Sequence, residues 1–401
     1  MKRLYVAAYH QSKFGKLKVM AIPEIVAGAV FGACDEIGVE PAAMDVGVIG
    51  AACNFSLNEQ GLLAGLMAMV PGLESKPLHA VENACASGGQ AVVAVAEKLL
   101  LGDGDVGIAV GYEKMRDGQG KMDGKLIGNV LGYFSHPDER GGKVFVFPHL
   151  FAEVMDCYMR THGVSEEDLA RIVVMEYANA NKNPYAQMQK VEVTLEQATR
   201  IEGINRYIID GLPLKTYDCS QISDGYAALI LATEEGLARL GVKKADSVEL
   251  AGFGQATDPL KKEGRDVLRP AGALRAMQTA YERAGVTAAD VGVAEVHDCF
   301  SVMGALGAEV LGRAEYGQGA RYWVDGKAAL DGECAINTSG GLIAKGHPIG
   351  ATGIAMVGWS AWQLLGKVPP ELQVKNPGVA ATFNIGGPIC ASVCTVLKPV
   401  A

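Results

Sequence analysis

The chain has 401 residues, of which 49% are hydrophobic and 20% charged, and it carries 51 glycines and a net charge of −9. This length suits a large α/β body or two to three domains of ordinary size, at roughly 100–200 residues each. The acidic charge is spread along the chain and long basic runs are absent, which argues against a nucleic-acid partner and against a membrane-surface helix.

The N-terminal sequence is similar to the start of a signal peptide, because the basic MKR is followed by the apolar LYVAAY. Its apolar run ends at His10, short of the roughly 7–15 residues that a signal peptide needs, so we expect a first β-strand there. No segment approaches the ~18 consecutive apolar residues of a membrane span, and no membrane association is expected. Nine cysteines without a dense framework predict free thiols in a reducing compartment, by default the cytosol.

Two parts of the chain repeat one pattern. Residues 33–50, ACDEIGVEPAAMDVGVIG, end a helix-like segment and continue into a strand, and residues 279–296, TAYERAGVTAADVGVAEV, do the same. A Gly-rich turn, an apolar helix and a further strand then follow, over 83–111 in the first copy and 337–397 in the second. Alternating β and α segments with short loops imply mixed sheets covered by helices, so we predict two similar α/β halves.

Residues from about 115 to 215 interrupt this pattern and have no counterpart in the second half. The segment begins Gly-rich and charged, and later contains a helix that we expect to start after a Ser165 N-cap and to stop at Pro184. We interpret it as an insertion that folds over a site and binds the non-reacting part of a substrate. The predicted organisation is therefore a first half over 1–245, including this insertion, and a second half over 246–401.

Cys85 is the first candidate catalytic residue. It ends a short polar stretch of sequence. Ser87, Gly88, Gly89 and an uninterrupted apolar segment of expected helix follow it. A free cysteine is more often a small buried core residue than a nucleophile. A thiol at a helix N-terminus, however, gains from the helix dipole and from backbone N–H groups that glycines let approach, so the context favours a nucleophile.

His347 lies between Gly346 and Pro348, in the glycine-rich stretch 337–353. That stretch lacks the GK[ST] ending and the G-x-G-x-x-G spacing of nucleotide-binding loops. The small and rigid neighbours favour an imidazole that is held in one geometry rather than a random surface histidine.

His297 and Cys299 end an apolar strand in AEVHDCFS, and strand alternation would point both side chains the same way. Such a pair could be half of a metal site. Because no second Cys or His cluster follows at ligand spacing, we predict no metal. The cysteines at 34, 334, 390 and 394 are interpreted as structural.

Four motifs together resemble the thiolase family. They are NACASGG around Cys85, HDCF at 297–300, GGLIAKGHPIGATG around His347 and NIGG at 384–387, in family order along nearly the whole chain. The HDCF form is similar to the sterol-carrier-protein-X type and to related archaeal and bacterial thiolases. The resemblance implies two α/β halves stacked in five layers, α-β-α-β-α, with a loop domain inserted in the first half.

The resemblance also implies a role for each motif residue. Cys85 corresponds to the acylated nucleophile and His347 to the base that activates it. His297 stands where many thiolases have the Asn of an NEAF motif, in the oxyanion site of the thioester oxygen. Cys299 would be the acid/base thiol, because the C-terminal CxG motif of other thiolases reads Asn384-Ile385-Gly386 here.

The same resemblance implies contacts and partners. Backbone N–H groups of Cys85 and Gly386 would stabilise tetrahedral oxyanions, and Ser220, Phe300 and Asn384 are further candidates for substrate contact. The implied reaction is cleavage of a 3-ketoacyl-CoA by CoA, or condensation of acyl-CoAs in reverse, with CoA as substrate and no other cofactor. A homodimer or homotetramer and a small accessory protein are expected partners.

Three alternatives remain open. A ketoacyl-synthase-like acyltransferase would use a cysteine and one or two histidines, but it has no use for a second thiol such as Cys299. A thiolase-like lyase or scaffold subunit usually loses the nucleophile or the acid, and all four positions are present here. An unrelated thiol hydrolase would need neither HDCF nor NIGG.

Overall fold

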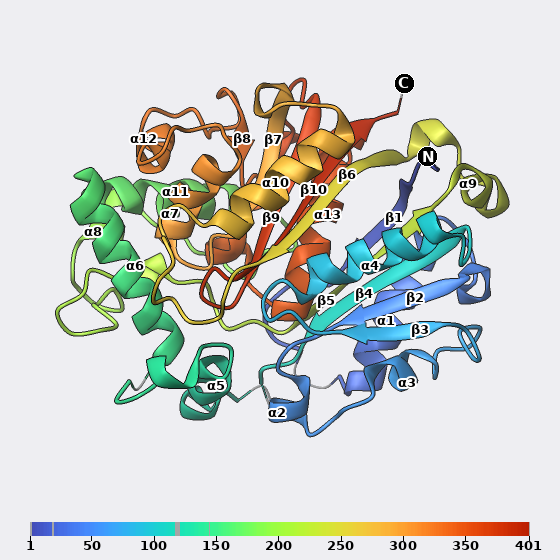
Figure 1. The fold of residues 1–401 in the computed structure, drawn as a ribbon, viewed down its shortest axis with the longest axis horizontal. Helices are drawn as coiled ribbons and strands as arrows, with labels where there is room; N and C mark the ends of the chain where they lie inside the picture. Colours follow the sequence, from blue (N-terminus) through green and yellow to red (C-terminus); the bar gives the residue numbers. More distant parts are fainter. Residues whose placement is uncertain (1, 18–19, 117–120, 144, 401) are drawn as a thin grey trace.

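The structure is a computed structural model that describes residues 2–17, 20–116, 121–143 and 145–400 (Figure 1). Within these residues, ten strands join in the order β3-β2-β4-β5-β1-β6-β10-β9-β7-β8. The first half contributes β1 (Tyr5–Gln11), β2 (Val46–Gly50), β3 (Leu78–Val81), β4 (Val106–Glu113) and β5 (Gly225–Ala232). The second half contributes β6 (Val248–Thr257), β7 (Val291–Val296), β8 (Ala335–Ile336), β9 (Val379–Gly386) and β10 (Ala391–Pro399).

The strand order is symmetric about the centre of the sheet. The first half runs β3-β2-β4-β5-β1 inward from one edge, and the second runs β8-β7-β9-β10-β6 inward from the other, so each strand has a counterpart in the same place. The counterparts β1 and β6 meet in the middle as an antiparallel pair, with Tyr5 opposite Glu249. The predicted pair of similar α/β halves is confirmed, and the short β1–β6 pairing additionally joins their two half-sheets.

Helices cover both faces of each half-sheet. α4 (Ser87–Leu101) and α13 (Ile349–Leu365) share one hydrophobic core with strands of both halves and form the middle layer. α1 (Ile22–Asp35) covers the other face of the first half-sheet. α10 (Ala271–Ala284) and α11 (Ser301–Val310) cover the other face of the second. The predicted α-β-α-β-α layering is therefore confirmed.

Strand alternation explains why both faces of each half-sheet are apolar. In β2, Val48 packs in the middle layer while the next residue, Ile49, packs under α1. In β5, Leu229 and Ile230 divide between the same two layers. A strand with apolar residues at successive positions is typical of a sheet that is buried on both faces.

α4 and α13 cross in close contact near their N-termini. A Cβ atom on Gly88 would lie 2.5 Å from the carbonyl oxygen of Gly350, and one on Gly353 would overlap the backbone nitrogen of Gly89. Gly88 is therefore required by the packing of the two helices, in addition to any role in the chemistry.

The connection between β4 and β5 is long. It covers residues 114–224, whereas the corresponding β9–β10 connection covers only 387–390. It contains α5 (Gly124–Gly132), α6 (Val146–His162), α7 (Glu166–Ala180) and α8 (Leu195–Thr199), and α6 to α8 gather beside α11 and α12 (Gly319–Val324) in Figure 1. Of the predicted insertion, residues 117–120 and 144 lie outside the described residues. The remaining short helices are α2 (Asn54–Asn58), α3 (Leu63–Met67) and α9 (Glu234–Leu240).

The helix expected after Ser165 is present as α7. The Ser165 hydroxyl oxygen accepts the backbone N–H of Asp168 at 3.1 Å, so the predicted N-cap is confirmed. The helix ends at Ala180, four residues before Pro184, because Asn181 to Asn183 form a turn that precedes the proline.

One stretch, Ala84–Leu101, is long and apolar enough to cross a membrane by length and composition alone. In the fold, 67% of it is buried, and α4 lies between the two half-sheets. Its apolar character is accounted for by its place in the core.

Candidate active site

Cys85 lies in a tight turn directly before α4. Ala84 adopts the left-handed conformation with φ +48°, and the Ala86 N–H donates to the Asn83 carbonyl at 3.0 Å. The Ser87 hydroxyl closes the turn, since it donates to the Ala84 carbonyl at 2.6 Å and accepts the Asn83 N–H at 2.8 Å. A non-glycine residue in this conformation is strained, so the surrounding bonds hold the turn in place.

The structure brings three of the predicted catalytic side chains together. The Cys85 sulfur, a ring nitrogen of His297 and a ring nitrogen of His347 all lie within 4.8 Å of one another. The two imidazoles are perpendicular, with ring centroids 5.0 Å apart. Cys85 is more than 200 positions from either histidine in sequence, and the stacked halves place the three side chains side by side.

Cys299, the fourth predicted catalytic residue, faces the same site from a small apolar cavity of about 100 Å³. Cys85, Cys299 and His347 all line this cavity. The insertion supplies part of its wall, including Phe147 and Leu131. The site is thus a small, mostly apolar space at the junction of both halves and the insertion.

His347 is fixed through its other ring nitrogen. Its Nδ1 lies 2.7 Å from the Thr352 hydroxyl, and its backbone N–H donates to the Ser223 hydroxyl at 2.9 Å. Its Nε2 has no hydrogen-bond partner among the described residues. Burial, with a smaller contribution from the charge of Lys345, lowers the pKa of His347 to about 3, so the imidazole is neutral.

His297 lies just beyond β7, which ends at Val296. The strand alternation used to orient His297 and Cys299 is therefore the wrong reason for their placement, because both residues lie in the loop that follows the strand. The backbone N–H of His297 donates to the Phe383 carbonyl at 2.9 Å. Burial, and then the nearby His347, lowers the pKa of His297 well below its usual value.

Asn384 connects His297 to the turn that carries Cys85. Its Nδ2 lies 2.9 Å from His297 Nδ1 and donates to the Cys85 carbonyl oxygen at 3.1 Å. Asn384 is 2% exposed and is not among the residues that line the cavity, whereas Ser220 and Phe300 are. The Ser220 N–H donates to the Cys299 carbonyl at 2.9 Å, so Ser220 also holds the loop that carries this thiol.

Phe300 and Gly386 complete the predicted set. The Phe300 ring stacks on Phe151 of α6 at 4.7 Å, which joins the HDCF loop to the insertion. Gly386 ends β9 against the Cys85 turn, where a Cβ atom would overlap the Asn83 carbonyl oxygen and lie 3.2 Å from the Ala86 nitrogen. Only glycine fits at this close approach.

The sequence context suggested that the helix start would favour a Cys85 thiolate. In the structure, burial raises the pKa of the Cys85 thiol to about 12, with further contributions from the charges of Glu113 and Glu82. The pKa of Cys299 is likewise raised well above its usual value by burial and by the nearby Cys85. Both thiols are therefore protonated near neutral pH, and Cys85 would need a base in order to act as a nucleophile.

Sequence reasoning missed a layer of buried charges behind the site. Glu295 Oε2 lies 3.7 Å from Lys345 Nζ, and the carboxylate of Asp298 accepts backbone N–H groups of Leu342 and Ile343 at 2.8 and 3.0 Å. These bonds tie the HDCF loop to the turn before His347. A lysine and a glutamate inside otherwise apolar or glycine-rich motifs were the available signal.

Glu176, from α7 of the insertion, belongs to the same buried layer. Its Oε1 accepts the Asn337 amide at 2.8 Å, and burial and the neighbouring Asp298 raise the pKa of Glu176 well above its usual value. Burial and the nearby Asp298 therefore favour the protonated form of Glu176, in which this pair carries one negative charge rather than two.

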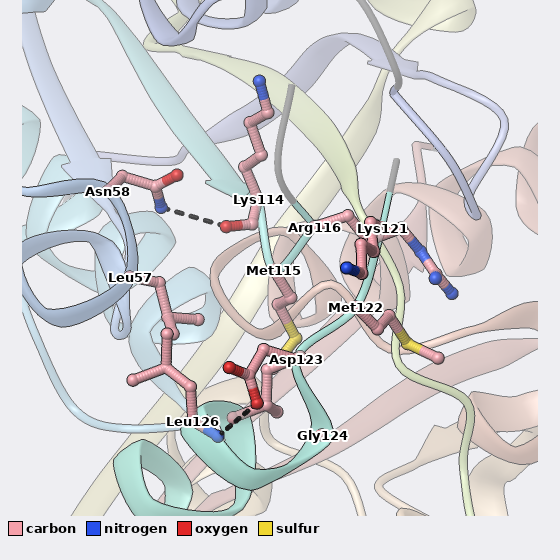
Figure 2. A pocket seen from close by; sticks show the side chains of 11 residues that line it. Leu57, Asn58, Lys114, Met115, Arg116, Lys121, Met122, Asp123, Gly124 and Leu126 are labelled. Atoms are coloured by element: carbon pink, nitrogen blue, oxygen red, sulfur yellow. Dashed lines mark hydrogen bonds between the residues drawn. The ribbon is translucent and has the colours of Figure 1, made fainter. Parts of the chain in front are cut away.

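Met115 lines a second, wider hollow of about 670 Å³ as well as the cavity of Cys85 (Figure 2). Lys114, Arg116 and Lys121 border it, and its rim is held by hydrogen bonds from Asn58 to the Lys114 carbonyl and from the Leu126 N–H to Asp123. None of the predicted site residues lies in it.

A duplicated five-layer α/β body, with a cysteine and two histidines meeting at the starts of its central helices, defines a thiolase-type acyltransferase. Family models agree with this assignment: "Thiolase, N-terminal domain" matches residues 5–235 and "Thiolase C-terminal domain-like" matches residues 254–399. The chain belongs to the thiolase family and is an acyltransferase enzyme.

Two relatives and one solved structure match most of this chain. The chain is 35% identical to an acetyl-CoA acetyltransferase of Methanothermobacter thermautotrophicus, covering 96% of this chain and 97% of the relative. It is 32% identical to human sterol carrier protein 2, over 79% of this chain and 57% of that protein. A solved structure described as an Ltp2-ChsH2(DUF35) aldolase shares the fold with a TM-score of 0.80 at 20% identity, covering 99% of this chain and 98% of that one.

Proposed function

We propose that the protein cleaves a 3-ketoacyl-CoA with CoA, or condenses acyl-CoAs in reverse, through an acyl group carried on Cys85. The observation that carries this proposal is the convergence of Cys85, His297 and His347 within 4.8 Å, with Cys299 on the same cavity. Relatives at 35% and 34% identity are named acetyl-CoA acetyltransferases, which supports this reaction class.

His347 serves as the base. The Thr352 hydroxyl has one hydrogen, which it donates to the Pro348 carbonyl at 2.9 Å, so its oxygen accepts Nδ1–H of His347. The lone pair of a neutral His347 is then on the unpartnered Nε2. This nitrogen takes the proton of the Cys85 thiol as the sulfur attacks C3 of the substrate.

The carbon–carbon bond then breaks. The tetrahedral intermediate collapses to acyl-Cys85, and the C2–C3 electron pair leaves as the acetyl-CoA enolate, whose oxygen accepts a hydrogen bond from His297. Cys299 donates its proton to C2, which leaves a Cys299 thiolate. Near the starts of α4 and α13, the helix dipoles favour the negative charge that develops.

The second half-reaction restores the enzyme. The Cys299 thiolate takes the proton of an incoming CoA thiol, and the CoA sulfur attacks acyl-Cys85. The Cys85 sulfur leaves and recovers its proton from His347. The cycle balances with CoA as a substrate and with no other cofactor.

The proposal is tested by incubating the protein with a series of 3-ketoacyl-CoAs, with and without CoA, and following loss of the ketoacyl absorbance. Loss that depends on CoA, together with an acyl group found by mass spectrometry on the peptide that carries Cys85, is the expected result. Loss without CoA would favour a hydrolase or lyase, and an acyl group on Cys299 would reverse the assignment of the two thiols.

Assembly and location are part of the proposal. We propose a homodimer or homotetramer, and light scattering that finds a particle of about 42 kDa, the mass of one chain, would contradict it. Nine free thiols support a reducing compartment, such as the cytosol.

An accessory protein is a further candidate partner. A relative at 29% identity from Thauera aromatica is named as a thiolase subunit, benzoylsuccinyl-CoA thiolase subunit BbsB. Full CoA-dependent turnover by the purified chain alone would remove the need for such a partner here.

A further inference from the structure

Asn384 occupies a buried position where the turn that carries Cys85, the HDCF loop and the two central helices, α4 and α13, meet. It lies on β9 opposite Val393 of β10. A Cβ atom on Gly89 would lie 2.8 Å from its Oδ1, and one on Gly353 would overlap the same oxygen. The side chain thus points into the middle layer, against the starts of α4 and α13.

The hydrogen bonds of Asn384 fix which way its amide faces. The Cys85 carbonyl oxygen can only accept, so the amide nitrogen, and not the oxygen, must lie 3.1 Å from it. The reverse orientation would place two acceptors face to face in a buried site. The second hydrogen of the same nitrogen is then available to His297 Nδ1, at 2.9 Å.

This bond determines the tautomer of His297. A ring nitrogen that accepts a hydrogen bond from an amide N–H carries no proton of its own, so in a neutral imidazole the proton is on the other nitrogen. The burial of His297, which is 0% exposed, favours the neutral ring. Its Nε2 therefore carries a hydrogen, and this nitrogen has no partner among the described residues.

We propose that Asn384 is a positioning residue that keeps the proton of His297 on Nε2. Through its hydrogen bond to the Cys85 carbonyl, Asn384 also fixes the position of Cys85 relative to this N–H donor. The inference deepens the proposed function, on which its catalytic meaning rests. It assigns opposite tasks to the two histidines: His347 Nε2 accepts a proton, whereas His297 Nε2 donates a hydrogen bond. It also replaces the expectation that Asn384 contacts the substrate.

The hydrogen bond between Asn384 and His297 also affects whether the site can bind a metal. The sulfur and two imidazoles are a donor set that could hold a metal ion. Because a nitrogen that carries hydrogen has no lone pair to offer, His297 Nε2 is held in the form suited to an oxyanion rather than to a metal.

The test uses Asn384→Asp, which keeps the shape but presents only acceptors when ionised. His297 should then carry its proton on Nδ1, and Nε2 should lose the hydrogen that the oxyanion needs. We expect kcat for cleavage to fall about 10²–10³-fold, the usual effect of losing one oxyanion donor, with a smaller change in KM. Thr382→Val is the matched control. Thr382 lies on the same strand as Asn384, and among the described residues its side chain is hydrogen-bonded only to the Thr395 hydroxyl, at 2.7 Å.

The direct readout is the ¹⁵N NMR spectrum of the protein labelled in its seven histidines, with the His297 signals identified by their loss in His297→Asn. In the native protein, His297 Nε2 should be protonated and Nδ1 unprotonated, and Asn384→Asp should reverse this while Thr382→Val leaves it unchanged. A proton on Nδ1 of native His297, or activity of Asn384→Asp within a few-fold of Thr382→Val, would overturn the inference. The spectrum requires no turnover, so it stays decisive even if the proposed reaction is not found.

Discussion

Lys345 and Glu295 form a buried ion pair, with 3.7 Å between Nζ and Oε2 and with side chains 0% and 1% exposed. Each residue stands two positions before a histidine of the site, Lys345 before His347 and Glu295 before His297. The pair therefore links the two segments that carry the imidazoles. The Glu295 carboxylate also accepts the Ser339 N–H at 3.1 Å, which extends the link to the turn before Lys345.

Lys345→Met should strongly destabilise the protein, because it leaves the Glu295 charge buried without a partner. A loss of about 3–5 kcal/mol in the free energy of unfolding is expected for a broken buried pair. The double variant Lys345→Met/Glu295→Gln should recover much of that loss, since no uncompensated charge remains. Denaturant unfolding measures both, and equal stability of the single and double variants would contradict the pairing.

Acidification should destabilise the fold through His347. The pKa of this imidazole is lowered to about 3 in the folded protein, chiefly by burial, and is about 6.5 in an unfolded chain. Between these values the unfolded chain binds the extra proton, so stability is lost as the pH falls. From pH 7 to pH 5, His347 should lower the free energy of unfolding by about 2 kcal/mol. The total loss over this pH range should therefore be smaller in His347→Gln. The same loss in both proteins would show that His347 titrates normally.

Cys85 should react as a buried thiol, not as a preformed thiolate. Because burial raises its pKa to about 12, the rate of its alkylation by iodoacetamide should keep rising from pH 7 to pH 10. Mass spectrometry of the Cys85 peptide over time gives this rate. A plateau near neutral pH would mean that a thiolate already exists before substrate binds, and would remove the need for His347 as its base.

Cys299→Ala should separate the two half-reactions. Acetyl-CoA should still acylate Cys85, at a reduced rate, while carbon–carbon cleavage and exchange of the acetyl-CoA methyl protons with deuterated solvent fall about 10²–10⁴-fold. Cys219→Ala is the matched control, because Cys219 is the third thiol on the same cavity, beside Cys85 and Cys299, and has no assigned role. Unchanged exchange in folded Cys299→Ala would remove Cys299 from the mechanism.

The sequence predicts those parts of the fold that a local pattern of residues determines. The repeat, the strand at Tyr5–Gln11 and the Ser165 cap follow from periodicity and from capping chemistry, and the structure has each of them. The motif residues Cys85, His297 and His347 also meet as expected.

The remaining features depend on contacts between distant segments. Glu113 ends β4, yet its carboxylate lies close enough to Cys85 to raise the thiol pKa. Glu176 reaches beneath the HDCF loop from the insertion, and Asn384 faces inward because of where β9 lies in the sheet. Glu113 and Glu176 are unremarkable in their own segments, and Asn384 was expected only to contact substrate, so no local pattern could have predicted these three contacts.

The symmetric strand order has a consequence for how such a site can arise. α4 and α13 occupy equivalent places in the two halves, and Cys85 precedes one while His347 precedes the other. Two identical half-chains associated as a dimer would present the same residue at both helix starts, either two thiols or two imidazoles. In one chain the two copies can differ, and here a thiol precedes one helix while an imidazole precedes the other. A chain that contains two similar but non-identical halves can thus present an unequal pair of groups at a nearly symmetric junction.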